Sequence, residues 1–335
     1  MNSRERFECT MNHREPDRTP LDIGGTPLTG MRPRCQEKLR ELLGFSNDSV
    51  EYCRRMDIDI LEWAETDFRC VGGIANLPGR HTREISSTAN IDCWGVRKEL
   101  IDGQWQITQS PLRGASLEDL KSYSWPEAAV EEKQLADWEE QAKKLKAQDR
   151  HVIVGGHPVF GILELGCWMC GYDDFFLKMA TDPDFVHLFF EKVLNIQLSV
   201  SEQYYAVLGP FIDITTSGDD FGSQNGPLLS PAMFDSFIAP YFAERIRRTK
   251  ELAQCYYWHH SCGSVFKLLD RIIDCGVDIL NPIQTSAAEM VPKSLKDRFG
   301  DRIVFWGAVD VQHFLPRAEK EEIHTHVNEL LNILG

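Results

Sequence analysis

The sequence predicts an α/β protein with the fold of a (β/α)8 TIM barrel, carrying a small β-hairpin insertion after the second strand. Short runs rich in β-branched residues alternate with longer stretches of helical periodicity. The last three predicted strands start about two dozen residues apart, the spacing of consecutive βα units in a parallel sheet. A doubly wound sheet is the second choice for such an alternation.

Seven segments have the composition of buried strands. They are Arg18–Ile23, Asp57–Leu61, His151–Gly155, Phe211–Thr216, Cys255–His259, Val277–Asn281 and Arg302–Trp306. Helices are expected at Pro231–Leu252, Val265–Cys275, Val291–Phe299 and Arg317–Leu334. A closed barrel needs an eighth strand, and none is found before Gly335. We therefore expect either a natural chain that continues past Gly335 or a barrel that closes in another way.

Two segments interrupt the alternation of strands and helices. Arg83–Ser110 alternates with a period of two around Asp102-Gly103, a strong hairpin turn, which predicts a small antiparallel excursion. Pro126–Gln148 is charged and periodic, which predicts a solvated surface helix. Neither segment contains a linker that would divide the chain. We therefore predict a single domain over residues 1–335, with the insertion at about 82–126.

The composition narrows the class of protein. The chain has 335 residues, 42% of them hydrophobic, a formal net charge of −15 and a sequence pI near 5.1. The acidic balance argues against nucleic acid or an anionic membrane as partner. There is no signal peptide, no apolar run of about 18 residues, and the ten cysteines are scattered like reduced thiols. We expect a soluble, cytoplasmic protein, for which a homodimer would be ordinary.

Polar or glycine residues follow every predicted strand. In barrels of this type the active site lies just beyond the carboxyl ends of the strands, so these residues are candidates for the site. The residues predicted to contact substrate are Gly25, Thr26, Asp59, His157, Gln224, Asn281 and Gln284.

Three carboxylates are predicted to be catalytic. Asp219 and Asp220 are adjacent and flanked by glycines, a pattern that favours neither helix nor strand and falls where a barrel binds substrate. Glu164 leads a predicted helix that also holds Cys167 and Cys170. We interpret those two cysteines as packing residues rather than as a redox or metal pair.

His260-Ser261-Cys262 ends the predicted strand Cys255–His259. An imidazole and a thiol two residues apart at the tip of a strand can hold a soft divalent metal such as zinc. The alternative is a hydrogen-bonded core histidine beside a buried cysteine. Two ligands do not complete a zinc site. Further ligands are expected from Glu164, Asp219, Asp220, His157 or the region beyond Gly335.

Six segments together resemble the uroporphyrinogen decarboxylase superfamily over nearly the whole chain. They are RTPLDIGGT, DCWG, SGDDFGSQNGPLLSP, HHSCGSV, GVDILNPIQTSA and VFWGAVDVQ. The resemblance implies a (β/α)8 barrel. It also implies one of two activities, either decarboxylation of porphyrinogens without a cofactor or methyl transfer between a corrinoid protein and a thiol or tetrahydrofolate-type acceptor.

The resemblance favours the methyltransferase branch. His260-x-Cys262 matches the zinc motif of that branch, whose further ligand near the C-terminus would lie beyond Gly335. The decarboxylases carry an arginine segment where this chain has IGGTPLTGM, so the main donors for clamping carboxylates are missing. We therefore expect a zinc-assisted methyltransferase with a corrinoid carried by a transient partner protein and a small-molecule methyl donor or acceptor.

Two alternatives remain open. One is a decarboxylase of a porphyrinogen or another polycarboxylate, supported by Asp59, which lies in a DIL context similar to that of the decarboxylase aspartate. The other is a binding protein that has kept the barrel without its catalysis.

Overall fold

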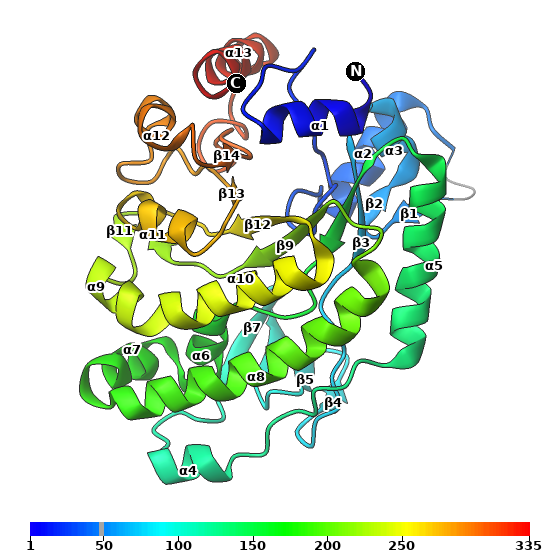
Figure 1. The fold of residues 1–335 in the computed structure, drawn as a ribbon. Coiled ribbons are helices and arrows are strands. Elements are labelled where there is room, and N and C mark those ends of the chain that lie inside the picture. Colours follow the sequence, from blue (N-terminus) through cyan, green and yellow to red (C-terminus); the bar gives the residue numbers. More distant parts are fainter. Residues whose placement is uncertain (47–49) are drawn as a thin grey trace.

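A six-stranded parallel sheet lies at the centre of the molecule (Figure 1). The structure is a computed structural model that describes residues 1–46 and 50–335. The strands follow the order β14-β13-β12-β9-β8-β3. They are β3 (Phe68–Gly72), β8 (Val152–Gly156), β9 (Ile214–Gly218), β12 (Tyr256–His260), β13 (Ile279–Asn281) and β14 (Val304–Phe305).

The sheet curls so that side chains from all six strands meet in one interior cluster. Its members on the strands are Phe68, Val152, Val154, Ile214, Tyr256, Trp258, Ile279 and Val304. Helix α1 (Ser3–Met11) adds Phe7 to this cluster. Trp306, just after β14, packs against Phe68 of β3 with ring centroids 4.5 Å apart, so the two edge strands approach each other. This is the interior of a barrel, whose edges are not hydrogen-bonded to each other in the described parts of the chain.

The prediction of a strand at Arg18–Ile23 is wrong. The backbone of Leu21 bonds to both the backbone and the side chain of Asp67, and Asp22 accepts a hydrogen bond of 3.0 Å from Trp306 Nε1. Because the residue before Leu21 is a proline without an N–H, a regular ladder is disfavoured at this point. The segment therefore bridges the two edges of the sheet mainly through side chains.

The prediction of a strand at Asp57–Leu61 is also wrong. β1 (Tyr52–Cys53) and β2 (Met56–Asp57) form a short antiparallel pair, and α3 (Ile58–Trp63) follows at once. The carboxylate of Asp57 accepts the N–H groups of Asp59 and Ile60 and so caps this helix. The barrel strand that follows is β3, where the charged Arg69 interrupts the apolar pattern that signals a buried strand.

The other five predicted strands are confirmed. β8, β12, β13 and β14 lie within two residues of their expected starts, whereas β9 begins at Ile214 rather than Phe211. The described residues contain no eighth strand in this sheet.

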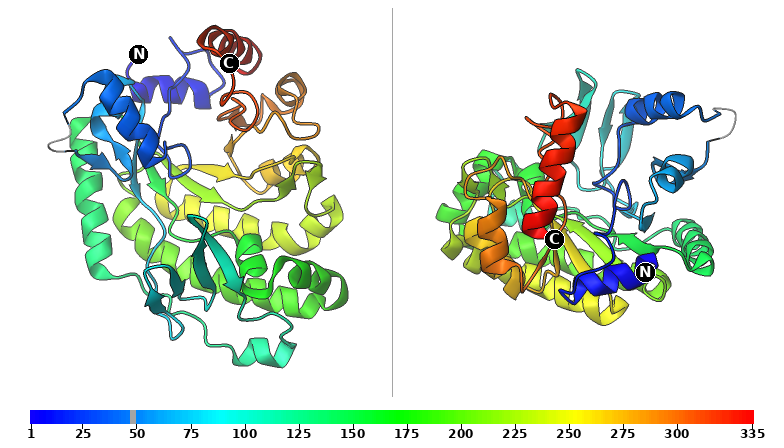
Figure 2. Two further views of the ribbon diagram at one scale, coloured as in Figure 1. Left: turned by 180° about the vertical axis from the view of Figure 1, so that it is seen from behind. Right: turned by 90° about the horizontal axis from the view of Figure 1, so that it is seen from above.

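The predicted antiparallel excursion is confirmed and contains two more strands than a single hairpin. It forms a sheet of β4 (Arg83–Ser86), β5 (Ala89–Ile91), β6 (Arg97–Ile101) and β7 (Gln104–Gln109), in that order. The turn at Asp102-Gly103 joins β6 to β7, with both residues at positive φ as such a turn requires. In the right-hand view of Figure 2 these strands stand out from the body of the molecule.

Helices cover the outer face of the central sheet, where α8 (Pro183–Leu208) and α10 (Ala239–Ala253) lie side by side (Figure 1). The remaining elements are α2 (Pro33–Leu43), α4 (Leu117–Ser122), α5 (Glu132–Gln148), α6 (Ile162–Cys170), α7 (Tyr172–Thr181), β10 (Gly222–Ser223), β11 (Gly226–Pro227), α9 (Pro231–Met233), the π-helix η1 (Phe234–Ile238), the 3₁₀-helix η2 (Phe266–Leu268), α11 (Leu269–Asp274), α12 (Pro292–Phe299) and α13 (Lys320–Leu334). The helices predicted in the second half of the chain and the surface helix α5 are therefore confirmed.

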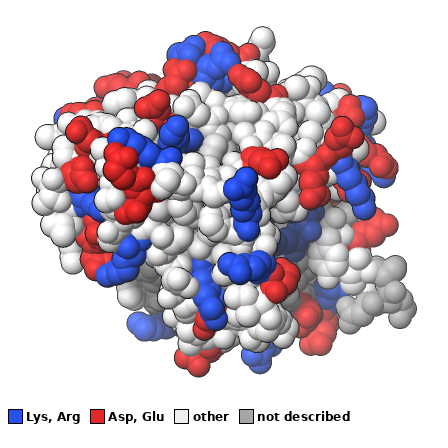
Figure 3. All heavy atoms as spheres, turned by 90° about the horizontal axis from the view of Figure 1, so that it is seen from below, with Lys and Arg blue, Asp and Glu red and all other residues white. Residues whose placement is uncertain are grey.

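Two further observations concern membrane-spanning segments and the distribution of surface charge. No helix in the described part of the chain combines the length and the apolar character needed to cross a bilayer. On the face shown in Figure 3, Lys and Arg are interspersed with Asp and Glu and do not gather into one basic area.

Candidate metal centre

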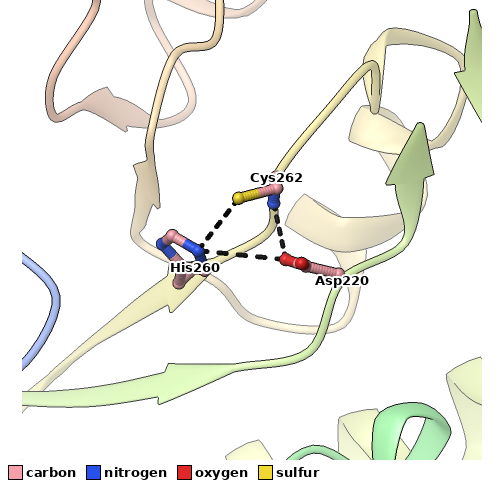
Figure 4. A group of neighbouring side chains, drawn as sticks. All are labelled: Asp220, His260 and Cys262. Carbon is pink, nitrogen blue, oxygen red and sulfur yellow. Dashed lines mark hydrogen bonds and ion pairs between the residues drawn. The ribbon is translucent and has the colours of Figure 1, made fainter. Parts of the chain in front are cut away.

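Three side chains with metal-binding atoms gather at the carboxyl ends of two neighbouring strands (Figure 4). Asp220 follows β9, His260 is the last residue of β12, and Cys262 comes two residues later. One ligand atom of each lies within 4.8 Å of the others. His260 Nε2 is 3.3 Å from Cys262 Sγ and 3.9 Å from Asp220 Oδ1. All three side chains are partly exposed, so an ion from solvent can reach them.

These separations suit a zinc ion. In a tetrahedral site, bonds of about 2.0–2.3 Å place neighbouring nitrogen, oxygen and sulfur ligands about 3.3–3.6 Å apart. The two distances from His260 Nε2 lie within about half an ångström of that range. Imidazole, thiolate and carboxylate are all zinc ligands, and three of them leave one position open, as in catalytic sites. The residues present therefore fit the metal that the sequence predicted.

The electrostatics of Cys262 also favour a cation. Burial, and then the charges of Asp220 and Glu164, raise the pKa of the Cys262 thiol to about 11. A divalent ion would counter the negative charges and allow the thiol to release its proton, as metal binding by cysteine requires. The Cys262 backbone N–H donates to Asp220 Oδ1 at 2.7 Å, which holds the two ligands together.

Asn281 of β13 sets the orientation of the His260 ring. Its Nδ2 donates to the carbonyl of Trp306 at 3.0 Å, which leaves its Oδ1 to accept from His260 Nδ1 at 2.8 Å. With its proton on Nδ1, the imidazole presents the Nε2 lone pair toward Cys262 and Asp220. Asn281, predicted to contact substrate, is therefore placed to support a metal ligand.

Replacing Asn281 with Ala should weaken zinc binding by about ten- to a hundredfold, the usual effect of removing the partner of a histidine ligand. Asn281→Asp keeps an acceptor for Nδ1 and should recover most of that affinity. Competition with a chelator measures both constants, and thermal unfolding checks that each variant is folded. Wild-type affinity in Asn281→Ala would show that this hydrogen bond does not orient the ligand.

The loops that carry the three side chains are held together by their backbones. The N–H of Ser264 donates to the carbonyl of Ser223, and the N–H of Phe221 donates to Ser261 Oγ, both at 2.8 Å. Gly263 has φ +77°, and a Cβ there would lie 2.5 Å from the carbonyl carbon of Gly222. Only glycine therefore fits between the two loops without a shift of the backbone.

Gln284 ties this arrangement to the loop after β13. Its Oε1 accepts the N–H of Gly263 at 2.7 Å, and its Nε2 lies 3.4 Å from Gln312 Oε1. Gln224 contributes its backbone carbonyl, which accepts the N–H of Ala288 at 2.9 Å, and its side chain is exposed. Both residues, predicted to contact substrate, thus hold the loops at the mouth of the barrel.

Asp219 has a structural position, although it was predicted to be catalytic. It is fully buried, and its carboxylate accepts the N–H groups of Leu163 and Glu164 at 3.0 and 2.9 Å, at the start of α6. The Asp219 carboxylate packs closely against the backbone of Gly161, where an added Cβ would lie 2.3 Å from Asp219 Cγ. Burial raises the pKa of Asp219 to about 6 despite these two bonds. Asp219 therefore caps α6 from another loop, and Asp220 alone of the pair joins the metal cluster.

Glu164, also predicted to be catalytic, lies in the first turn of α6. Burial, followed by the charges of Asp219 and Asp220, raises the pKa of Glu164 to about 8. The protonated form of Glu164 is therefore favoured when no cation lies beside it, and a cation bound to the three ligands would favour its charged form. Cys167 and Cys170 of the same helix are buried in the hydrophobic core, as the packing interpretation predicts.

Two residues predicted to contact substrate lie away from the metal cluster. His157 is buried between the sheet and the outer helices, and its Nδ1 bonds to the hydroxyl of Tyr205 on α8 at 2.6 Å. It follows β8 in the alternation that sends Val152 and Val154 inward, so its side chain faces outward. Asp59 lies on α3, where it pairs with Arg40, because the predicted strand is a helix.

Gly25 and Thr26 belong to a turn that reaches the site through its neighbour Leu28. The N–H of Gly25 bonds to Asp22 Oδ1, and the hydroxyl groups of Thr26 and Thr29 are 3.0 Å apart. Leu28 Cδ1 lies 3.9 Å from the position of a Cβ on Gly218, the residue opposite His260 in the sheet. The turn therefore borders the metal cluster. The polar atoms of Gly25 and Thr26 form hydrogen bonds to other residues of the turn and not to the cluster.

The sequence analysis missed Asp22 and the role of Ser261. Burial raises the pKa of Asp22 to about 6, and its oxygens accept from Gly25 and from Trp306 at the seam of the barrel. The available signal was a single acidic residue in RTPLDIGGT, two residues after a proline and next to a glycine pair's apolar neighbour, Ile23. Ser261 was noted as the spacer between two ligands, although its hydroxyl locks the loop of Asp220.

The comparison with known families agrees with this fold. A family profile for Uroporphyrinogen decarboxylase (URO-D) matches residues 101–335, well over half of the chain. The chain belongs to the uroporphyrinogen decarboxylase family. The fold of this family is a TIM barrel, so the expected fold class is confirmed, with a sheet that stays open between β3 and β14 in the residues described.

A solved structure and the curated proteins complete the comparison. A methyltransferase from Methanosarcina mazei superposes with a TM-score of 0.63 and 17% identity, covering 99% of this chain and 90% of that chain. At this identity the similarity establishes the fold alone. No curated protein matches the chain.

Proposed function

We propose that this member of the family is a methyltransferase that moves a methyl group between a corrinoid and a thiol or tetrahydrofolate-type acceptor, assisted by zinc. In this proposal the corrinoid is carried by a transient partner protein. The observation that carries the proposal is the cluster of Asp220, His260 and Cys262 at the carboxyl ends of β9 and β12. A decarboxylase that works without a cofactor does not require an imidazole, a thiol and a carboxylate with the spacing of metal ligands, so the cluster favours a zinc-assisted reaction.

The residues around the cluster support nucleophile activation. Zinc with one open position would lower the pKa of an acceptor thiol and keep it ionised at neutral pH. Asn281 holds the His260 ring in the tautomer that binds metal, and the locked loops fix Cys262 and Asp220 beside it.

The structure offers less to a porphyrinogen decarboxylase. The turn at residues 22–29 borders the site and contains neither Arg nor Lys, so it supplies no donor for the carboxylates of such a substrate. Asp59, which favoured this alternative in the sequence, pairs with Arg40 on α3, and 56% of its side chain is exposed.

Methyl transfer from free methylcobalamin to a thiol or to tetrahydrofolate tests the proposal. We expect the zinc-loaded protein to demethylate methylcobalamin, a chelator to stop the reaction, and added zinc to restore it. Asp59→Asn should leave the rate unchanged. Turnover of a porphyrinogen that resists the chelator and depends on Asp59 would instead establish the decarboxylase.

A further inference from the structure

The turn between β1 and β2 carries an arginine in a backbone conformation that usually belongs to glycine. Cys53 pairs with Met56, so Arg54 and Arg55 form a two-residue hairpin turn. Arg54 has φ +59°, which lies in the left-handed region. Hairpin turns with a positive φ at this position favour glycine, because a Cβ is strained there. Strained residues of this kind cluster at functional sites, which makes the Arg54 side chain a candidate for function.

The Arg54 guanidinium lies at the carboxyl end of β3. Its Nε donates to the carbonyl of Gly72, the last residue of β3, at 3.3 Å. Its Nη2 lies 3.0 Å from the position that a Cβ on Gly73 would take. Figure 1 shows β1 and β2 beside β3. Since the sheet is parallel, the carboxyl end of β3 belongs to the same rim as the metal cluster at the ends of β9 and β12.

Arg54 has no counterion in the described part of the chain. No carboxylate there forms an ion pair with it, and its two Nη atoms have no hydrogen-bond partner. Burial raises the pKa of the neighbouring Cys53 and Cys70 thiols, so they stay neutral and supply no negative charge. The Arg54 side chain is partly exposed, so a ligand can reach it. Its two Nη groups form a planar fork that suits a carboxylate, which accepts two parallel hydrogen bonds.

The turn at residues 22–29 connects this arginine to the metal cluster. On one side it packs against the hairpin, since a Cβ on Gly24 would lie 2.1 Å from Met56 Cγ. On the other side, Leu28 Cδ1 lies 3.9 Å from the position of a Cβ on Gly218, the last residue of β9. The Leu28 side chain is 53% exposed. The turn therefore offers an apolar surface that runs from the hairpin to the cluster.

The distance between the cation and the metal cluster limits the size of a shared ligand. β3 lies three strands away from β12 in the sheet. With strands about 4.8 Å apart, the Arg54 guanidinium and the metal ligands are separated by about 10–15 Å. A thiol of two or three carbon atoms is too short to contact both. A longer thiol with an anionic group at its far end has the required shape.

We propose that Arg54 binds the carboxylate of an extended thiol whose sulfur reaches the metal cluster, and that such a thiol is the methyl acceptor. The inference rests on the proposed function and selects one class of acceptor within it. Zinc would hold the sulfur, Leu28 would contact the apolar chain, and Arg54 would fix the far end. A porphyrinogen, with its several carboxylates, would leave most of them without a cation.

Binding of 8-mercaptooctanoate and 8-mercaptooctanol to the zinc-loaded chain tests the inference by calorimetry. The two thiols have the same length, and only the first carries a carboxylate. The acid should bind the wild-type chain about tenfold or more tightly than the alcohol, and Arg54→Gln should abolish this preference. The control Arg55→Gln, at the exposed neighbour in the same turn, should keep the preference. A preference that survives in Arg54→Gln would overturn the proposal.

Mercaptoacetate tests the predicted length of the ligand. It carries both a thiol and a carboxylate, but it is too short to reach from the metal to Arg54. Its affinity should therefore be the same in the wild-type chain and in Arg54→Gln. A loss of affinity for mercaptoacetate as large as that for 8-mercaptooctanoate would contradict the proposed span.

Arg54→Gly separates ligand binding from a role in folding. Glycine adopts φ +59° without strain, which should offset its greater freedom in the unfolded chain and keep the thermal unfolding temperature near that of the wild type. The preference for the acid should nevertheless be lost. A lower unfolding temperature with an unchanged preference would show that Arg54 supports the fold instead.

These binding measurements need no corrinoid, so they distinguish the inference from the proposed function. Methyl transfer from methylcobalamin to 2-mercaptoethanol, without any preference for the long acid, would overturn the inference and leave the proposed function standing. A preference that depends on Arg54, without methyl transfer to any thiol, would reject the proposed function and with it the role of the long thiol as methyl acceptor.

Discussion

Cys262→Ser is expected to lower the affinity for zinc by more than about a hundredfold and to abolish methyl transfer. Removing a residue that hydrogen-bonds to a metal ligand typically lowers metal affinity ten- to a hundredfold, so removing the ligand itself should lower it further. A serine hydroxyl does not ionise readily and is a poor substitute for a soft thiolate. The backbone N–H of residue 262 still donates to Asp220, so the loops should keep their position. Zinc affinity is measured by chelator competition, and the rate with methylcobalamin as donor.

The controls for this substitution separate loss of a ligand from loss of the fold. Cys35→Ser makes the same chemical change at an exposed cysteine and should leave both affinity and rate unchanged. The thermal unfolding of metal-free Cys262→Ser should match that of the metal-free wild type. Unchanged activity of Cys262→Ser would show that the Cys262 thiol is not needed for methyl transfer.

Gly263→Ala should destabilise the protein by about 3 kcal/mol and weaken metal binding at the same time. The new methyl group would lie 2.5 Å from Gly222 C and 2.7 Å from Ser223 N, which are backbone atoms that cannot move aside cheaply. The φ of +77° adds strain for any residue with a Cβ. Moving this loop displaces Cys262 relative to Asp220, so a single substitution affects both quantities. Urea unfolding and chelator competition measure them.

Gly114→Ala is the matched control for Gly263→Ala. Gly114 has φ +69° with no atom within 4 Å of an added Cβ, so only the backbone strain remains. Gly114→Ala should lower the free energy of unfolding by about 1 kcal/mol and leave zinc affinity unchanged. Equal destabilisation by the two substitutions would show that the close contact between the loops is unimportant.

Local sequence patterns were sufficient for the part of the site that lies on one strand. His260 and Cys262 are two residues apart at the tip of β12, and an apolar run followed by polar residues reveals such a tip. Asp220 was one of several expected further ligands. The order of the sheet selects it, because β9 pairs with β12 and places Gly218 opposite His260. Pairing between distant strands is not encoded in a short window of sequence.

The differences between the expected and the observed positions have local physical causes. Asp57 caps a helix, so the alternating DIDIL that resembles a strand is the start of α3. His157 was placed at the mouth because it follows a strand, but the alternation of side chains turns it outward toward Tyr205. Asp219 and Asp220 are adjacent and identical in type, yet Asp219 accepts from the start of α6 and Asp220 accepts from Cys262. The sequence does not distinguish these two roles.

The metal content of the purified chain, combined with X-ray absorption at the zinc edge, tests the central claim most directly. If Asp220, His260 and Cys262 hold the metal, the protein should contain about one zinc per chain with a sulfur neighbour at about 2.3 Å. Cys262→Ser should lose that sulfur signal. A chain that binds no zinc, or one whose zinc shows no sulfur neighbour, would contradict the account.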